Sequence, residues 1–205
     1  MNWTIVGTII VAFITAVLGP MVLELVRNRL NKNKTNTSDS MYTQMEVDVE
    51  VEEQLRILLN NLDCDRIWIT QFHNGGHFYS SGVSIKKFSI FYEVVSPGTA
   101  IIQHQFQNIP TSFFSRALKH IHDFNDLYVT DMEDRNITSY GLRDTAYETG
   151  CRSLFLVSLK NASGKFHGAL GVEHIKGVHE FTDEEKDIIR DAGIYISGIL
   201  STIHK

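Results

Sequence analysis

The sequence predicts an α+β domain that follows a single membrane-spanning helix. Three features of the 205-residue chain lead to this prediction. Residues 5–23 form an uncharged apolar run, long enough to cross the hydrocarbon core of a bilayer as a helix. Residues 41–62 and 182–203 carry apolar side chains at the period of a helix. Between them lie β-branched and aromatic runs separated by Gly, Pro and Asn, a pattern typical of strands and turns.

The apolar run at 5–23 is interpreted as a membrane anchor and not as a cleaved signal peptide. Basic residues follow the run instead of preceding it, and no small-residue cleavage pattern comes after it. These basic residues are Arg27, Arg29, Lys32 and Lys34. Cytoplasmic flanks carry the excess of Lys and Arg, so we expect the N-terminus outside and the C-terminal domain in the cytoplasm. Residues 3–26 are expected to contact the lipid bilayer, with Trp3 at the headgroup layer.

The chain is predicted to divide into three parts. Residues 1–30 contain the anchor and its basic end, residues 31–40 form a flexible linker, and residues 41–205 form one domain. The linker is polar and offers no apolar side chain for packing. A flexible linker would only tether the domain, whereas a helical one could pass a signal. The sequence leaves open which of the two it is.

Charge and cysteine content exclude several classes of function for the domain. The net charge of the chain is −5, and since residues 1–40 carry +2, the rest carries −7. An acidic domain without a basic stripe is not expected to bind nucleic acid. The two cysteines, Cys64 and Cys151, belong to no CxxC or Cys/His cluster. In the cytoplasm both are expected to be reduced, so a disulfide framework is excluded.

The first predicted element of the domain is a helix at 42–62. Its apolar stripe recurs at i, i+4, i+8, i+11 and i+15 and comprises Val47, Val51, Leu55, Leu58 and Leu62. This stripe can pack on its own domain or pair with a second copy, and the sequence leaves both open.

Strand and helix signals then alternate. The predicted elements are, in order, strands at 65–73, 86–95 and 99–106, a helix at 111–122, a strand at 126–130 and a helix at 138–148. Asn74, Gly75 and Gly76 are expected to end the first strand in a turn.

The last part of the domain has the strongest local signals. Apolar runs at 152–159 and 165–175, joined by a short Asn/Gly-containing loop, predict a β-hairpin. Thr182 and Glu185 fit a capping box that opens the C-terminal helix at 182–203. Its expected apolar face comprises Ile188, Ile189, Ala192, Ile196, Ile199, Leu200 and Ile203.

The assembled order of elements resembles the GAF domain, a ligand-sensing module related to PAS domains. Residues 150–159, GCRSLFLVSL, resemble the family pattern G-x-R-S-x-x-x-x-P-L, with Ser158 at the proline position. Residues 168–173, GALGVE, resemble the G-x-L-x-L strand, and residues 181–185, FTDEE, match the entry to the last helix. The resemblance covers residues 45–203 in topology and residues 150–203 in motif.

The resemblance implies a central antiparallel sheet of about six strands. Long N- and C-terminal helices would cover one face, and short helices and loops would enclose a pocket on the other. It further implies a parallel homodimer through the helices at 42–62 and 182–203. A small molecule or a protein partner is expected to bind for sensing or regulation.

Nine residues are predicted to bind the ligand, from the polar segment after the first strand, from aromatic positions and from the pocket roof that the resemblance implies. They are Phe72, His73, Asn74, Phe91, Phe113, Tyr140, Arg143, Tyr147 and Glu173. Arg143 could clamp an anionic ligand or form a helix-surface ion pair. Glu173 stands beside His174, so the pair could form acid–base machinery or a pocket wall. No third metal ligand lies near His73 and His77, so no metal site is predicted.

No catalysis and no cofactor are expected. GAF domains that bind bilins attach the pigment to a cysteine usually followed by histidine, whereas Cys151 is followed by Arg152. The cyclic-nucleotide signature of the family is absent. The function expected is ligand or partner binding by a membrane-tethered domain. The alternatives are a degenerate interaction scaffold with a closed pocket, and an enzyme. The enzyme would act through His73, Glu173 or Cys151, or as a methionine sulfoxide reductase that uses Cys64 and Cys151.

Overall fold

The computed structural model describes residues 19–77, 80–134 and 142–202. The strands in these parts are β1 (Arg66–His77), β2 (Ser84–Val95), β3 (Ile109–Pro110), β4 (Asp126–Val129), β5 (Ser153–Lys160) and β6 (Phe166–His174). The helices are α2 (Gly19–Leu62), the 3₁₀ turn η2 (Thr111–Phe114), α3 (Ser115–Phe124), α4 (Arg143–Glu148) and α5 (Asp183–Leu200). Residues Met1–Glu46 and Val47–Lys205 form separate units, and the sheet belongs to the second.

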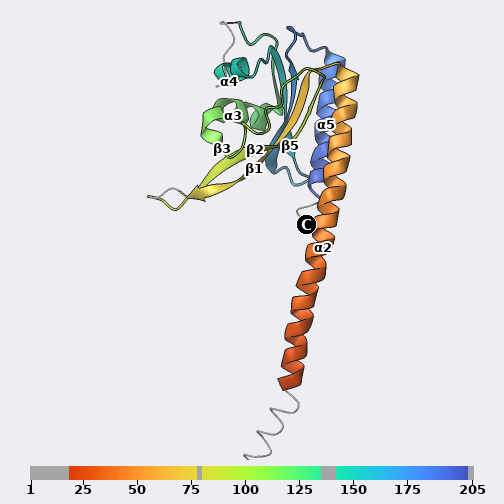
Figure 1. Cartoon of the computed structure of the whole chain (residues 1–205). Helices are drawn as coiled ribbons and strands as arrows, with labels where there is room; N and C mark the ends of the chain where they lie inside the picture. Colours follow the sequence, from red (N-terminus) through yellow and green to blue (C-terminus); the bar gives the residue numbers. More distant parts are fainter. Residues whose placement is uncertain (1–18, 78–79, 135–141, 203–205) are drawn as a thin grey trace, which may run out of the picture. The chain divides into compact units, whose positions relative to one another are not determined.

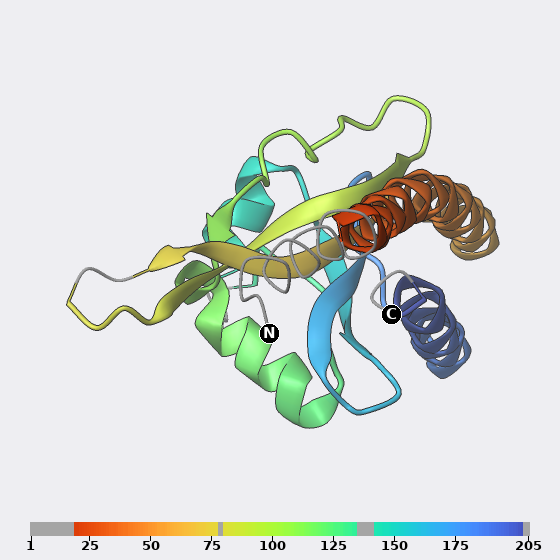
Figure 2. The same cartoon turned by 90° about the horizontal axis from the view of Figure 1, so that it is seen from below.

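The strands form one sheet in the order β3-β2-β1-β6-β5-β4, and every neighbouring pair is antiparallel. In Figure 1 the part of α2 next to the sheet and α5 lie side by side, while α3 and α4 lie on the other side of the strands. Figure 2 shows the same helices on the two faces of the sheet from below. The α+β class and the six-stranded antiparallel sheet are therefore confirmed.

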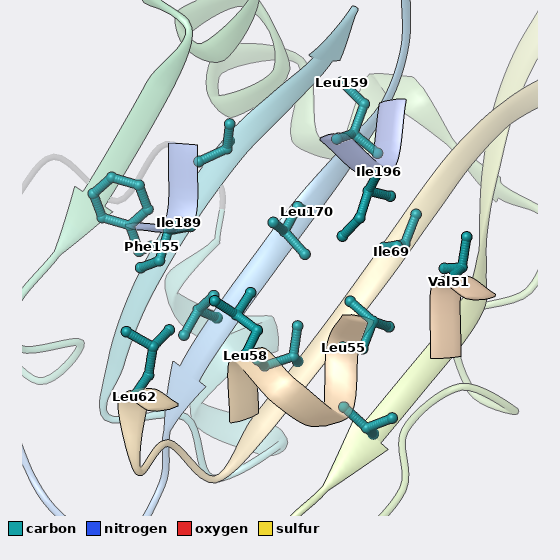
Figure 3. Close-up of a cluster of buried hydrophobic side chains, with 14 of the residues drawn as sticks. Val51, Leu55, Leu58, Leu62, Ile69, Phe155, Leu159, Leu170, Ile189 and Ile196 are labelled. Atoms are coloured by element: carbon teal, nitrogen blue, oxygen red, sulfur yellow. The ribbon is translucent and has the colours of Figure 1, made fainter. Parts of the chain in front are cut away.

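The layer under α2 and α5 is the larger hydrophobic core. The whole predicted stripe from Val47 to Leu62 is buried. Figure 3 shows Leu55 from α2 and Ile196 from α5 pointing toward Ile69 and Leu170 on the sheet. Each buried Leu or Ile contributes roughly 1.5–3 kcal/mol relative to an exposed position, so this layer holds both helices on the sheet.

Helix α2 runs without interruption from Gly19 to Leu62, so residues 31–40 are helical. Polar composition favours a flexible linker there, but no Gly or Pro occurs between residues 21 and 62 to interrupt the helical hydrogen bonds. The structure thus has the helical alternative at 31–40. The division into anchor, linker and domain remains a prediction.

The predicted membrane span falls mostly outside the described residues. In the apolar run at 5–23, residues 5–18 come before Gly19, which is the first residue that the structure describes. Within the described residues, no helix is both long and apolar enough to cross a membrane. The anchor and its orientation therefore stay predictions.

The C-terminal elements agree closely with those predicted from the sequence. The hairpin is β5 and β6, and β5 is paired on both sides and buried along nearly its whole length. The capping box is formed, since Thr182 Oγ1 accepts from the Glu185 amide and Glu185 Oε2 accepts from the Thr182 amide. The Ser158 amide donates to the Asn125 carbonyl at 2.8 Å, a bond that proline at this position could not make.

The strand predicted at 99–106 is absent, and the expectation is wrong. The amides of Ile102 and Gln103 donate to the Glu93 carboxylate instead of to a neighbouring strand. The Gln105 amide donates back to the Ile102 carbonyl and closes a turn. The β-branched residues gave a strand signal, but the Ile102 amide donates to the Glu93 side chain and the Thr99 amide donates to the Ser96 carbonyl.

The turn predicted at residues 74–76 is also wrong, because β1 continues to His77. A register shift separates Asn74 from His77 in the pairing with β2. A Cβ at Gly75 would overlap the Lys87 side chain, and Gly76 has a φ of +103°. The glycines therefore keep the strand going past a bulge. Since β6 pairs with β1 only as far as Gln71, the ends of β1 and β2 extend beyond the sheet as a two-stranded arm (Figure 1).

Candidate functional site

A cavity of about 80 Å³ lies on the face of the sheet opposite α2 and α5. Strands β1, β2, β5 and β6 form its floor, and η2, α3, α4 and the loop after β2 form its walls. The aromatic lining residues are Trp68, Phe88, Phe106 and Phe114. The aliphatic ones are Ile90, Ile102, Ala117, Leu118, Ile121, Leu142, Ala146, Leu154, Leu156 and Ala169. The polar ones are Thr70, Thr145, Thr149 and Glu173.

The alternation of side chains along the strands decides which residues face this cavity. Ile67 and Ile69 of β1 belong to the core under the helices, whereas Trp68 and Thr70 line the cavity. Gly171 is opposite Trp68 on β6, and a Cβ there would overlap the indole ring. The glycine thus lets the Trp68 ring lie flat against the neighbouring strand.

A buried charge cluster, formed by Arg66, Glu93 and Glu173, adjoins the cavity. Arg66 Nη1 donates to Glu173 Oε2 at 2.6 Å, and Arg66 Nε lies 3.4 Å from Glu93 Oε1. The side chains of Arg66 and Glu93 are each 1% exposed, and that of Glu173 is 6% exposed. Trp68 Nε1 donates to Glu173 Oε1 at 2.6 Å. Only the Glu173 carboxylate of this cluster also lines the cavity.

The charges of the cluster do not balance. One guanidinium faces two carboxylates, so with both carboxylates ionised the cluster carries one excess negative charge. Burial raises the pKa of Glu173 above its usual value, although Arg66 and Trp68 act in the opposite direction. Glu93 receives further hydrogen bonds from two backbone amides. Burial thus favours the protonated form of Glu173, the carboxyl that faces the cavity, whereas Arg66 and Trp68 favour its ionised form.

Among the predicted ligand-binding residues, Glu173 lines the cavity, and the segment at 72–74 lies elsewhere. Phe72, His73 and Asn74 are on the arm of β1 and β2. The Phe72 ring packs edge-on against Phe166, with centroids 4.8 Å apart. His73 Nε2 lies 2.9 Å from Ser89 Oγ, and Asn74 Oδ1 accepts from Lys86 Nζ at 2.7 Å.

The other predicted positions do not converge on the cavity either. Phe91, Phe113 and Tyr147 are exposed at the surface. Arg143 begins α4, and its Nη2 donates to the Glu133 carbonyl at 3.3 Å. Tyr140 lies in the segment 135–141, outside the described residues. Residues close to these, such as Phe114 beside Phe113 and Ala146 beside Tyr147, line the cavity instead.

Of the residues of the enzyme alternative, Cys151 lies close enough to Glu173 to feel its charge, whereas His73 lies far from both. Arg66 is opposite Glu173, and His73 is seven positions further along β1, roughly 23 Å away at about 3.3 Å per residue. Successive strand residues face opposite sides, so His174 does not face the cavity with Glu173. Its ring instead stacks on His179 at 4.0 Å.

Both cysteines are free and buried. Burial raises the pKa of the Cys64 thiol to about 12, and burial followed by the Glu173 charge also raises the pKa of Cys151. Reductase chemistry needs a thiolate, and both environments disfavour one. Across the described parts of the chain, no group of three or more His, Cys, Asp and Glu side chains is placed to hold a metal ion.

Arg66, Trp68 and Glu93 are site residues that the sequence reasoning missed. The available signal was a charged residue inside each of two apolar strands, Arg66 in β1 and Glu93 in β2. Such a residue is rarely buried without a partner. The register that pairs Arg66 with Glu173 and Trp68 with Glu93 could not be derived from local patterns.

Comparison with solved structures finds GAF domains of the same architecture. GAF3 from Slr1393 of Synechocystis sp. PCC6803 in its photoproduct state is 14% identical, with a TM-score of 0.60, and the match covers 77% of this chain and 95% of that one. The blue-light absorbing form of the Thermosynechococcus elongatus PixJ GAF domain is 16% identical, with a TM-score of 0.60, covering 79% and 89%.

A third similar structure is the GAF domain/HD domain protein from Geobacter sulfurreducens. It is 17% identical, with a TM-score of 0.56, and the match covers 77% of this chain and 94% of that chain. No family model matches the chain, and no curated protein matches it. Similarity at this level of identity concerns the fold and not the ligand. The chain has the GAF fold.

Proposed function

We propose that this chain is a membrane-tethered GAF domain that binds a small apolar or amphipathic ligand in its cavity and regulates a partner without catalysis. The observation that supports this proposal is the cavity itself. It is lined by four aromatic and ten aliphatic side chains, with one buried carboxylate at its wall. Ligand sites commonly combine an apolar lining with a few polar groups that fix the orientation of the ligand.

Tethering is proposed from the sequence. The uncharged run at 5–23 is long enough for one span, and the basic residues after it favour a cytoplasmic location of the domain. In this proposal the anchor fixes location, and α2 connects the anchor to the sensing domain. Reporter fusions at the two ends of the chain, active only in the cytoplasm, test the orientation. Activity at the N-terminal end alone contradicts it.

Output is proposed to travel through a parallel homodimer of α2 and α5. Several apolar side chains on these helices face outward, with Ile194 72% exposed and Tyr195 51% exposed on α5. Val49 and Ile57 are exposed on α2. Exposed apolar groups on neighbouring helices fit a second copy of the same face.

Light scattering of the full chain in detergent tests this dimer. The unaltered chain is expected to be dimeric, and Ile194→Glu is expected to be monomeric. Glu184→Lys, at an exposed position in the first turn of α5, is the matched control and should stay dimeric. A monomer for the unaltered chain contradicts the proposed output.

A melting-temperature screen tests ligand binding. The full chain is heated with neutral and charged molecules of about three to five non-hydrogen atoms, and at least one is expected to raise its melting temperature. Ala169→Leu, which adds three carbons to the cavity lining, should remove the shift. Asp183→Leu is the control, because Asp183 is exposed.

A closed-pocket interaction scaffold is the second function to consider, and the size of the cavity favours it. Cavities that hold drug-sized ligands have volumes of roughly 300–1,000 Å³, whereas this one has about 80 Å³. The Phe88 and Phe114 rings meet edge-on at 5.6 Å and occupy part of the space. If no molecule in the screen raises the melting temperature, the scaffold replaces the ligand sensor.

A further inference from the structure

The cavity wall combines two features that recognise the same chemistry. One is the Glu173 carboxylate, which is buried and faces the cavity. The other is the group of four aromatic side chains from Trp68, Phe88, Phe106 and Phe114. Carboxylates attract cations, and the faces of aromatic rings attract them through the ring quadrupole. Each feature alone favours a cation, and the two together strengthen that preference.

The charges of the cluster also favour a cation in the cavity. Arg66 supplies one positive charge, while Glu93 and Glu173 supply two negative charges. Glu93 is satisfied by the amides of Ile102 and Gln103 as well as by Arg66. Glu173 receives one donor on each oxygen, from Arg66 and from Trp68, and each carboxylate oxygen can accept more than one hydrogen bond. With both carboxylates ionised, a cation in the cavity would bring the cluster to neutrality.

The volume sets the size of that cation. A protein cavity of about 150 Å³ holds benzene, which has six non-hydrogen atoms. A cavity of about 80 Å³ holds a molecule of roughly half that size. We propose that the cavity selects a small alkylammonium ion of about three to five non-hydrogen atoms, with its ammonium group on Glu173 and its alkyl chain among the aromatic rings. This inference rests on the proposed function, because it presupposes that the cavity takes a ligand.

Propylammonium and 1-propanol are the probes that distinguish a cation-selective cavity from a cavity that binds small ligands without regard to charge. Both have four non-hydrogen atoms and differ mainly in the charge of one terminal group. At neutral pH the amine is almost fully protonated, since alkylamines titrate near pH 10. Propionate, which carries the opposite charge, is the sign control. All three are titrated into the full chain at constant ionic strength, and binding is measured by calorimetry.

Propylammonium is expected to bind at least tenfold tighter than 1-propanol, and propionate is expected not to bind. Equal affinities of the amine and the alcohol overturn the inference and leave the ligand cavity intact. Binding of neither probe overturns the inference, and the melting-temperature screen then decides separately whether the cavity takes another ligand. Tighter binding of propionate also overturns the inference, because it requires a net positive site.

Two variants locate the effect at the cluster. Glu173→Gln removes the carboxylate that faces the cavity and should lower the preference for the amine to about the level of the alcohol. Glu93→Gln removes the same charge from a side chain outside the cavity lining, and should lower the preference in the same direction. Using both variants keeps the test valid if one of them fails to fold. A tenfold preference that survives in both folded variants contradicts the role of the cluster.

Discussion

Arg66 on β1 and Glu173 on β6 are directly opposite each other across the sheet, and Arg66 Nη1 lies 2.6 Å from Glu173 Oε2. This pair connects the fold to the site. Arg66 also donates to the carbonyl of Ala100 after β2 and to that of Thr149 after α4. One buried side chain therefore joins the floor of the cavity to two segments that border it.

Replacing Arg66 with Met should destabilise the domain by about 3–5 kcal/mol. The substitution leaves Glu93 and Glu173 buried without a cation, and breaking a buried ion pair from one side costs about this much. The free energy of unfolding is measured by urea denaturation. Arg56→Met is the matched control, since Arg56 is 64% exposed beside Glu52 and should change stability by less than about 0.5 kcal/mol. Equal effects of the two substitutions would contradict the buried network.

Gly171→Ala should displace the Trp68 ring and break its hydrogen bond to Glu173. An added Cβ at Gly171 overlaps the indole, and overpacking of this kind costs about 1–3 kcal/mol. Tryptophan fluorescence should change together with the unfolding midpoint. Gly177→Ala is the control, because a Cβ at Gly177 meets no atom within 4 Å. Unchanged fluorescence in Gly171→Ala would show that the position of the Trp68 ring does not depend on the glycine.

Asp65 should make the domain more stable above about pH 5 than below it. Burial alone would raise the pKa of Asp65, but hydrogen bonds from Lys176 Nζ, from the amides of Ile175 and Lys176 and from Ser96 hold it well below its usual value. A carboxyl with a lowered folded-state pKa stabilises the fold above its unfolded pKa of about 3.9, and this contribution is lost as the pH falls further.

The measurement is the free energy of unfolding between pH 3 and pH 7 for the unaltered chain and for Asp65→Asn. The variant should lose about 2 kcal/mol at pH 7 and should depend less on pH. Asp183→Asn, at an exposed carboxyl, should follow the unaltered chain. If Asp65→Asn keeps the full pH dependence, other carboxyls cause it.

Elements with a strong local period could be predicted from the sequence. The stripe from Val47 to Leu62 is buried as expected, and the capping box at Thr182 is formed. Which of two neighbouring residues on a helix is buried could not be predicted. The 3₁₀ turn η2 precedes α3, so Phe113 faces outward while Phe114 is buried. On α5, Ile188 is partly exposed although its neighbour Ile189 is fully buried.

The site was the hardest part to predict, because long-range register builds it. The pairing of β1 with β2 shifts between Ile69 and Thr70, and this irregularity brings Ile90 and Phe88 to the cavity face. No local pattern encodes that shift. Glu173 was identified because a carboxylate ends an apolar strand, whereas its partner Arg66 lies 107 positions away in the chain.

The central claim is that a small ligand occupies the cavity, and alanine-methyl NMR of the full chain tests it most directly. Ala117, Ala146 and Ala169 line the cavity, while Ala162 is exposed on the loop between β5 and β6. As propylammonium or 1-propanol is added, the three cavity methyl signals are expected to shift along saturating curves, and the Ala162 signal is expected to stay in place. Cavity methyl signals that do not move with either probe, or that move no more than Ala162, would contradict the claim.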